Sequence, residues 1–387
     1  MHSLLPTKIF LIIVLLIFPV FNLHPQGKIF PPELIQAVQL AYSGNYKKAG
    51  TLAEIYIQNN PGDPNGYMVR GMVFDWERIL SSKPGIPLKE KTAEYHKKAN
   101  QIAFQIWHRN QDDVDALIDL GNSYIFLGRA YSDLGKGLKA VLTAKHGPKH
   151  LKKALGKNPN RTDALTALGF YNYIADSTPK HLAAFKSLLG IKGSRSEGFK
   201  QLQRAATVPH PFQYDALVAL YYICDKFEED YPQALNYIQK LKEIFPENPK
   251  WQFLVAEFLE NQDTVKGIKG YADFIVWCKA GKERCSDKFY FLAYFRSGRI
   301  AKQLGQSEGA KDLLNKALTF APESHIKSRA EALILLAELE AESGNLALAL
   351  KNYRRADELN EISKSQKTQI RHSIEKICQE DPPPPDC

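Results

Sequence analysis

The stretch YFRSGRIAKQLGQSEGAKDLLNKALTFAP, residues 294–322, contains the pattern that decides the fold. In it, Gly305 is followed by alanines at positions 310 and 317, and the unit closes with Pro322. Glycine ends a helix by supplying a left-handed cap, and proline stops the next one. The small residues allow the two helices to pack closely. The stretch therefore predicts an antiparallel helix pair, which must stack on neighbouring pairs to bury its apolar face.

The same offsets recur elsewhere in the chain. Gly344 precedes alanines at positions 349 and 356, and Gly44 precedes Ala49, Tyr56 and Pro61. Composition is that of a folded soluble protein, with 44% hydrophobic and 24% charged residues. The recurrence predicts helix pairs over 31–61, 64–111, 113–158, 161–208, 211–246, 249–286, 288–322 and 326–361. A last helix over 363–379 is polar on most of its surface and is expected to cap the array.

These offsets resemble the tetratricopeptide repeat. The resemblance implies an all-α fold, an α-solenoid of tetratricopeptide-like helix pairs with a C-terminal capping helix. We expect this solenoid to span residues 28–379, with a Pro-rich tail over 380–387. The second helix of the third pair should break at Gly147-Pro148, because proline cannot continue a helix there.

The centre of the chain carries a second resemblance. Its elements are an aromatic cluster at 170–173, a helix led by Pro179, and the pattern Gly193-x-Arg195-x-x-Gly198. Together they are similar to a stretch of the inclusion-clearance family of tetratricopeptide proteins and to uncharacterised bacterial exported relatives. That resemblance implies a helical scaffold associated with membranes or protein complexes, and it implies no catalytic residues.

The N-terminus has the form of a targeting segment. Lys8 precedes an apolar run, residues 9–21, as in a secretory signal. The run is shorter than the roughly 20 residues that span a bilayer. No small-x-small cleavage site is evident before Gly27, so an uncleaved anchor is the alternative. Residues 1–27 are therefore expected to be a signal peptide or N-terminal anchor of an exported, periplasmic or envelope-associated protein.

Export would permit disulfides. Cys278 and Cys285 form one close pair in sequence and Cys378 and Cys387 another, although sequence spacing alone does not fix the distance between two cysteines. Cys224 lies in an apolar run and is expected to be a buried free thiol. No metal site is expected, because the cysteines lack zinc-site spacing.

Positive charge is concentrated in one segment. The formal net charge is +9, yet residues 136–204 contain fourteen Lys or Arg and three acidic residues, which gives +11. This predicts a basic face for a protein partner or an anionic membrane surface. The amphipathic helix expected over 179–190 suits either role, or is a packing helix with solvated lysines. Basic candidates for partner binding are Lys149, Lys152, Lys153, Lys180, Lys186 and Arg195.

First helices of tetratricopeptide pairs line a concave groove where peptides dock. The polar residues Asn122, Asn172 and Arg296 and the aromatic Tyr173 are the candidates there. We expect no enzyme and no cofactor, because nucleophile, phosphate-binding and zinc-protease motifs are missing. A nucleic-acid partner is not expected either, since no recognised binding motif is present. The sequence thus predicts an exported scaffold for protein–protein interaction in envelope complexes. The alternative is a membrane-surface-associated assembly factor using the basic central helix.

Overall fold

The computed structural model describes residues 30–83, 85–177, 187–281, 285–359, 362–380, 383 and 387. Over these ranges the regular structure is helical and contains no strand, which confirms the all-α prediction. The expected targeting segment over 1–27 lies outside the described residues. So do Lys180, Lys186 and most of the Pro-rich tail.

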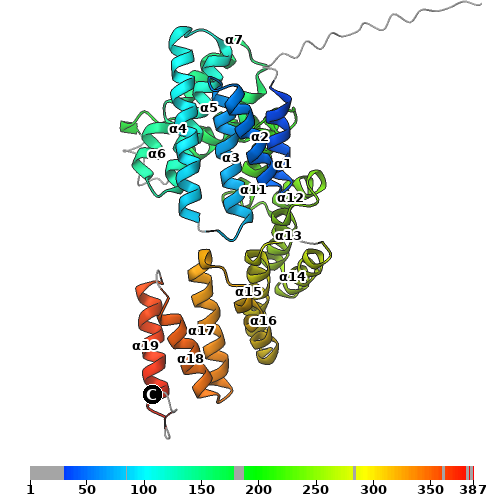
Figure 1. The fold of residues 1–387 in the computed structure, drawn as a ribbon, viewed down its shortest axis with the longest axis vertical. Coiled ribbons are helices and arrows are strands. Elements are labelled where there is room, and N and C mark those ends of the chain that lie inside the picture. The colour runs from blue at the N-terminus through cyan, green and yellow to red at the C-terminus, as the bar shows by residue number, and fades with distance from the viewer. Residues whose placement is uncertain are drawn as a thin grey trace, which may run out of the picture.

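The helices follow one another as antiparallel pairs, in the predicted order (Figure 1). The first four pairs are α1 (Pro32–Tyr42) with α2 (Tyr46–Asn59), α3 (Pro64–Leu80) with α4 (Gly85–Arg109), α5 (Val114–Asp133) with α6 (Gly137–Ala144) and α7 (Gly147–Lys157), and α8 (Leu165–Asp176) with α10 (Arg195–Ala205). The remaining pairs are α11 (Gln213–Lys226) with α12 (Tyr231–Ile244), α13 (Pro249–Gln262) with α14 (Thr264–Lys279), α15 (Asp287–Gln303) with α16 (Ser307–Thr319), and α17 (Ile326–Glu342) with α18 (Leu346–Asp357), before α19 (Lys364–Cys378).

The repeat glycines have the role that their spacing predicts. Gly305 ends α15 with a φ of +72°, and Gly344 ends α17 with a φ of +78°, a conformation that other residues adopt at a cost. Inside the pair, a Cβ on Gly298 would lie 2.8 Å from the Leu314 side chain. The glycines therefore serve both the turn and the close crossing of α15 and α16. The predicted break in the third pair is also present, since α6 and α7 are separate helices.

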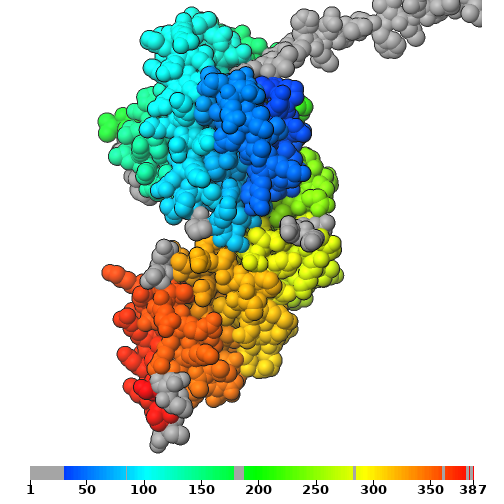
Figure 2. Space-filling view, in the orientation of Figure 1, coloured from blue at the N-terminus to red at the C-terminus, as the bar shows by residue number. Residues whose placement is uncertain are grey.

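The molecule has an upper part, coloured blue to green, and a curved lower array, coloured yellow to red (Figure 2). The upper part closes on itself because the first pair packs against the start of α13. The buried amide of Asn248 donates from Nδ2 to the Tyr42 carbonyl oxygen at 2.7 Å. The Tyr42 ring lies 4.7 Å from that of Trp76 and 6.3 Å from that of Trp251, measured between centroids. Contacts thus join α1 and α3 to helices about 200 residues later in the chain.

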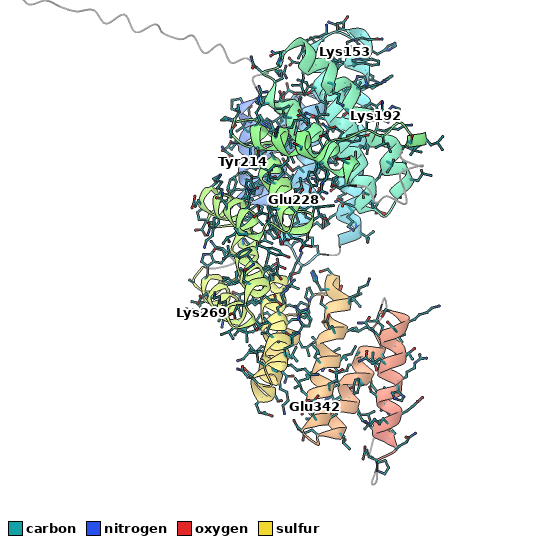
Figure 3. All side chains as sticks on the ribbon, turned by 180° about the vertical axis from the view of Figure 1, so that it is seen from behind. Lys153, Lys192, Tyr214, Glu228, Lys269 and Glu342 are labelled. Atoms are coloured by element: carbon teal, nitrogen blue, oxygen red, sulfur yellow. A yellow bond between two sulfur atoms is a disulfide. The ribbon has the colours of Figure 1, made fainter. Side chains whose placement is uncertain are left out.

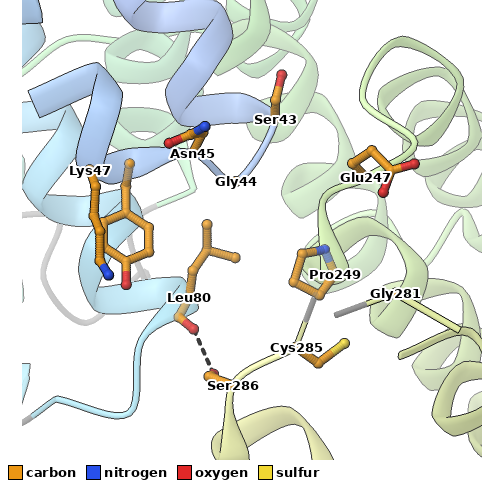
Figure 4. A pocket seen from close by; sticks show the side chains of 11 residues that line it. Ser43, Gly44, Asn45, Lys47, Leu80, Glu247, Pro249, Gly281, Cys285 and Ser286 are labelled. Atoms are coloured by element: carbon orange, nitrogen blue, oxygen red, sulfur yellow. Dashed lines mark hydrogen bonds between the residues drawn. The ribbon is translucent and has the colours of Figure 1, made fainter. Parts of the chain in front are cut away.

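A second set of contacts joins the end of α3 to the segment before α15. Ser286 Oγ donates to the Leu80 carbonyl oxygen at 2.7 Å (Figure 4). Lys288 Nζ donates to the Ile79 carbonyl oxygen at 2.9 Å. Beside them is a cleft of about 780 Å³, lined in part by Ser43, Lys47 and Glu247. Cys285 also lines this cleft. The cleft marks the junction between the upper part and the lower array.

All five cysteines are accounted for. Cys278 forms a disulfide with Cys285, and Cys378 forms one with Cys387, so both close pairs are bonded. Cys224 is buried and free, as predicted. No helix in the described ranges has the length and apolar composition needed to cross a membrane.

The C-terminal helix closes the array. Ile370 and Ile377 of α19 are buried in a cluster with Leu333 of α17 and Tyr353 of α18. A capping box at Ser363 begins the helix. Most of the remaining α19 side chains are polar and face solvent, so α19 ends the stack as a cap should.

Candidate partner-binding groove

The crossing of α8 and α10 fixes the local geometry of the basic centre. A Cβ on Gly198 would lie 2.5 Å from the Gly169 carbonyl oxygen and 2.6 Å from the Tyr173 backbone nitrogen. A Cβ on Gly193 would lie 2.3 Å from the Asn172 carbonyl oxygen. Only glycine allows backbones to approach so closely. The two glycines of the Gly193-x-Arg195-x-x-Gly198 pattern therefore hold residues 191–194 and α10 against α8.

Arg195, between those glycines, connects three segments. Its Nη2 donates to Tyr173 Oη at 3.0 Å and to Glu228 Oε1 at 2.9 Å. The Tyr173 hydroxyl donates to the same carboxylate. The Tyr173 hydrogen bond holds the pKa of Glu228 below its usual value, against burial and together with the Arg195 hydrogen bond. Two of the predicted partner-binding residues thus link α8 and α10 to the loop after α11.

The groove is formed by α7, α8, residues 192–194 and α10. Its volume is about 360 Å³, and it is lined by Lys152, Leu155, Leu168, Asn172, Lys192, Gly193, Ser194, Glu197 and Gln201. Leu168 is buried and Leu155 partly buried, so the lining includes apolar surface. This volume lies in the lower part of the range of binding pockets, roughly 300 to 1,000 Å³.

Amide side chains form one ordered wall of the groove. Asn172 Nδ2 donates to Gln201 Oε1 at 2.9 Å, and Gln201 Nε2 donates to Glu197 Oε1 at 2.9 Å. Each amide is oriented by its neighbour, and the chain of hydrogen bonds ends on a carboxylate. Asn172 is 3% exposed, so it contributes only a small part of the groove surface, at the buried base of the lining.

The lysines of the groove form no ion pair with the described residues, although Glu197 lies in the same lining. Lys152 and Lys192 are exposed and form no ion pair within the described residues, and the same holds for Lys149 on α7. Lys153 differs, because its Nζ lies 3.0 Å from an Asp112 carboxylate oxygen. Figure 3 shows Lys153 and Lys192 in the upper part of the molecule, away from Lys269 and Glu342. A partner carboxylate could therefore find unpaired cations at this groove.

The remaining predicted residues lie elsewhere and are engaged internally. Asn122 is 1% exposed, and its Nδ2 donates to the Asp163 carbonyl oxygen at 3.1 Å. Arg296 on α15 lies between two carboxylates of α13, at 2.7 Å from Glu257 and 2.9 Å from Glu260. These two side chains stabilise the array in this structure.

Arg296 belongs to a series of charge pairs along the lower array. Arg299 lies 2.7 Å from Glu260, and Lys302 pairs with Glu338 of α17. Burial alone would raise the pKa of Glu260, but hydrogen bonds from Tyr271, Arg299 and Arg296 hold it below its usual value. The basic side chains of α15 are thus neutralised by glutamates of α13 and α17, whereas the groove lysines form no ion pair with the described part of the chain.

Sequence reasoning found part of the groove. It named Lys152, Asn172 and the neighbouring Arg195, but it did not single out Leu155, Leu168, Lys192, Glu197 or Gln201 as a site. These residues come from three separate elements, and only the glycine pattern beside Lys192 pointed to the close crossing. Within the described ranges no group of three or more His, Cys, Asp or Glu side chains is placed to hold a metal ion.

The stacked pairs and the groove define an all-α helical-repeat protein, a class whose stacked surfaces serve protein–protein interaction. Residues 292–324 match the tetratricopeptide repeat family, at the unit that the sequence pattern identified. No curated protein matches the chain.

Several solved structures share aspects of the fold at low identity. Yeast Tom70 is 14% identical with a TM-score of 0.43, over 92% of this chain and 84% of that chain. The human IFIT1 dimer with m7Gppp-AAAA is 13% identical with a TM-score of 0.49, over 87% and 68%. A repeat protein of Cytophaga hutchinsonii is 13% identical with a TM-score of 0.37, over 78% and 99%.

Proposed function

We propose that this protein is an exported helical-repeat scaffold that binds a protein partner in the periplasm or envelope, and that it is not an enzyme. The observation that carries the proposal is the groove of α7, α8 and α10, where unpaired lysines border apolar side chains. Elsewhere along the array, glutamates of neighbouring helices neutralise three cations of α15, Arg296, Arg299 and Lys302. A surface with unpaired charge beside apolar atoms is suited to a complementary partner.

Two features support export. The first is the signal-like run at residues 9–21. The second is the pair of disulfides, because disulfides persist mainly in oxidising compartments. The resemblance of residues 170–205 to the inclusion-clearance family and exported relatives supports a scaffold associated with membranes or protein complexes. Residues 1–27 fused to a reporter that is active only outside the cytoplasm provide the test, and an inactive fusion would remove export from the proposal.

Site-specific photo-crosslinking tests the binding role. A photoreactive residue replaces Lys152 in the groove or, as a control, the exposed Lys269 on α14. We expect a discrete crosslinked protein from position 152 in cells, with none from position 269, and its loss when Lys192→Glu is added. Equal crosslinking at both positions would mean that the groove is not the contact surface.

A membrane-surface-associated assembly factor is the second candidate. It is favoured by Leu188, which lies within the basic segment 136–204 and is 83% exposed. An apolar side chain beside lysines suits an anionic bilayer surface. Co-sedimentation with anionic and neutral vesicles tests it. Binding to anionic vesicles that is lost with Leu188→Ser would favour this candidate over the scaffold.

A further inference from the structure

We propose that the groove of α7, α8 and α10 takes an acidic peptide segment of the partner, with carboxylates placed beside an apolar side chain. This rests on the proposed function, since it assigns the partner's chemistry at the same groove. Three observations carry it: the unpaired lysines, their position on two sides of one recess, and the apolar part of the lining.

The charge argument compares lysines on the same helix. Lys153 and Lys157 of α7 share the Asp112 carboxylate, at 3.0 and 3.2 Å. Lys152, one position before Lys153, points to the groove instead and forms no ion pair within the described residues. The described part of the chain therefore supplies a carboxylate to Lys153 and Lys157, which lie outside the groove, and none to Lys152, which lines it. A partner's carboxylate would complete the pairing.

The second argument concerns the shape of the site. Lys152 comes from α7 and Lys192 from the segment before α10, so the two ammonium groups approach one recess from different elements. A bilayer surface would meet lysines on a convex face and would not need a recess. A peptide can enter the recess and place an aliphatic or aromatic side chain against Leu155 and Leu168. The geometry therefore favours a peptide over a membrane.

Glu197 makes one side of the groove acidic, opposite in charge to the lysines, and so predicts how a bound peptide is oriented. It is the carboxylate among the groove residues, and it lies on α10, where it accepts the Gln201 amide at 2.9 Å. Like charges repel, so the peptide carboxylates should lie towards Lys152 and Lys192 and away from Glu197. Removing the Glu197 charge should therefore strengthen binding, whereas reversing the lysine charges should weaken it.

The experiment measures fluorescence anisotropy with the full-length protein. The probes are a labelled acidic peptide of Asp and Glu around a central Leu, and its Asn and Gln counterpart. We expect the acidic peptide to bind at least about tenfold more tightly, with affinity falling as salt rises. The double variant Lys152→Glu with Lys192→Glu should lose about tenfold in affinity, and Glu197→Gln should gain about twofold.

A matched variant controls for net charge. Lys97→Glu with Lys269→Glu makes the same charge change at exposed lysines outside the groove, and it should bind like the unmodified protein. Circular dichroism checks that each variant is folded. Equal binding of the two peptides, or equal loss in the matched variant, would overturn the proposal.

Two outcomes separate this inference from the function on which it rests. Crosslinking from position 152 without any preference for the acidic peptide would leave the scaffold role standing and refute the acidic segment. Binding to anionic vesicles that depends on Lys152 and Lys192, with no peptide binding, would assign the groove to a membrane and overturn the peptide. Tight acidic-peptide binding that is lost only in the groove variant is the result that we expect.

Discussion

At the scale of single residues, the close crossing of α8 and α10 depends on glycines, which have no side chain. Gly198 and Gly169 bring two backbones so close that the groove residues on either side, Asn172 and Gln201, are within hydrogen-bond distance. The same approach brings Arg195 to Tyr173. A methyl group at this crossing would separate the helices and with them the two walls of the groove.

We therefore predict that Gly198→Ala lowers the free energy of unfolding by about 1 to 3 kcal/mol, because the new Cβ has no space. Chemical denaturation followed by circular dichroism measures the effect. Gly309→Ala is the control. It lies in α16 with nothing within 4 Å of the added Cβ, so it should raise stability by up to about 1 kcal/mol. Similar losses in both variants would contradict the close-approach explanation.

Buried histidines give the protein a pH dependence. Burial lowers the pKa of His96, His150 and His210 from 6.5 to about 4. Below pH 6.5 the unfolded chain binds protons that the folded chain does not, so stability falls as pH drops from about 6.5 to about 4. Each histidine contributes a slope of about 1.4 kcal/mol per pH unit within that window. Unfolding free energies at pH 7.5, 6.0 and 5.0 should show the decrease, and His96→Gln should flatten it.

Asp215 acts in the opposite direction. Burial raises the pKa of its carboxyl from 3.8 to about 6, against the attraction of Arg129. The folded state therefore holds this proton up to a higher pH, and its contribution to stability falls as pH rises from about 4 to about 6. Asp215→Asn removes the opposing contribution and should steepen the loss of stability on acidification. An unchanged slope in both variants would refute this account.

At the scale of elements, α19 covers the apolar end of the array, and we expect it to keep the protein monomeric. Ile370 is fully buried against α17 and α18, while Thr368, two residues earlier, is exposed. We predict that Ile370→Asp releases α19, because a buried unpaired charge is costly, and that the exposed face of α18 then self-associates. Hydrogen exchange over 364–378 and light scattering measure the two effects. Thr368→Asp should leave both unchanged, and a monomeric Ile370→Asp protein would contradict the capping role.

At the scale of the whole molecule, the Cys278–Cys285 disulfide supports a contact made far away in sequence. It ties α14 to Cys285, the residue before Ser286, and Ser286 and Lys288 donate to the carbonyl groups at the end of α3. We predict that replacing both cysteines by serine raises hydrogen exchange at residues 78–83 and lowers stability by about 2 kcal/mol. The equivalent change at Cys378 and Cys387 should leave residues 78–83 unchanged. Equal protection in both variants would show that the junction does not depend on the disulfide.

The helix pairs could be predicted from sequence because their signals are local. Gly305, Ala310, Ala317 and Pro322 act within one unit. Most helix pairs lie within a few residues of the predicted bounds, and the largest difference is in the sixth pair, which the sequence predicts to end at residue 286 and which ends at Lys279. The groove could not be predicted in full, because Leu155, Leu168 and Lys192 come from different elements. The burial of Asn122 likewise depends on a crossing that helical periodicity does not specify. The closure of α1 on α13 was also beyond prediction, since the contacts of a repeat array are expected between neighbours.

The hydrogen bond from Asn248 to Tyr42 joins residues that are 206 positions apart in the sequence. During synthesis, Tyr42 therefore leaves the ribosome well before Asn248 is made. A ribosome adding about 5 to 20 residues per second needs roughly 10 to 40 seconds to make the chain between these two positions. Throughout that interval Tyr42 and Trp76 lack Trp251, their later neighbour. Helices α16 to α19 have no comparable wait, because their main contacts are with helices close in sequence. Demand for chaperones should therefore concentrate on the nascent chain before residue 251 and decline once α13 has emerged.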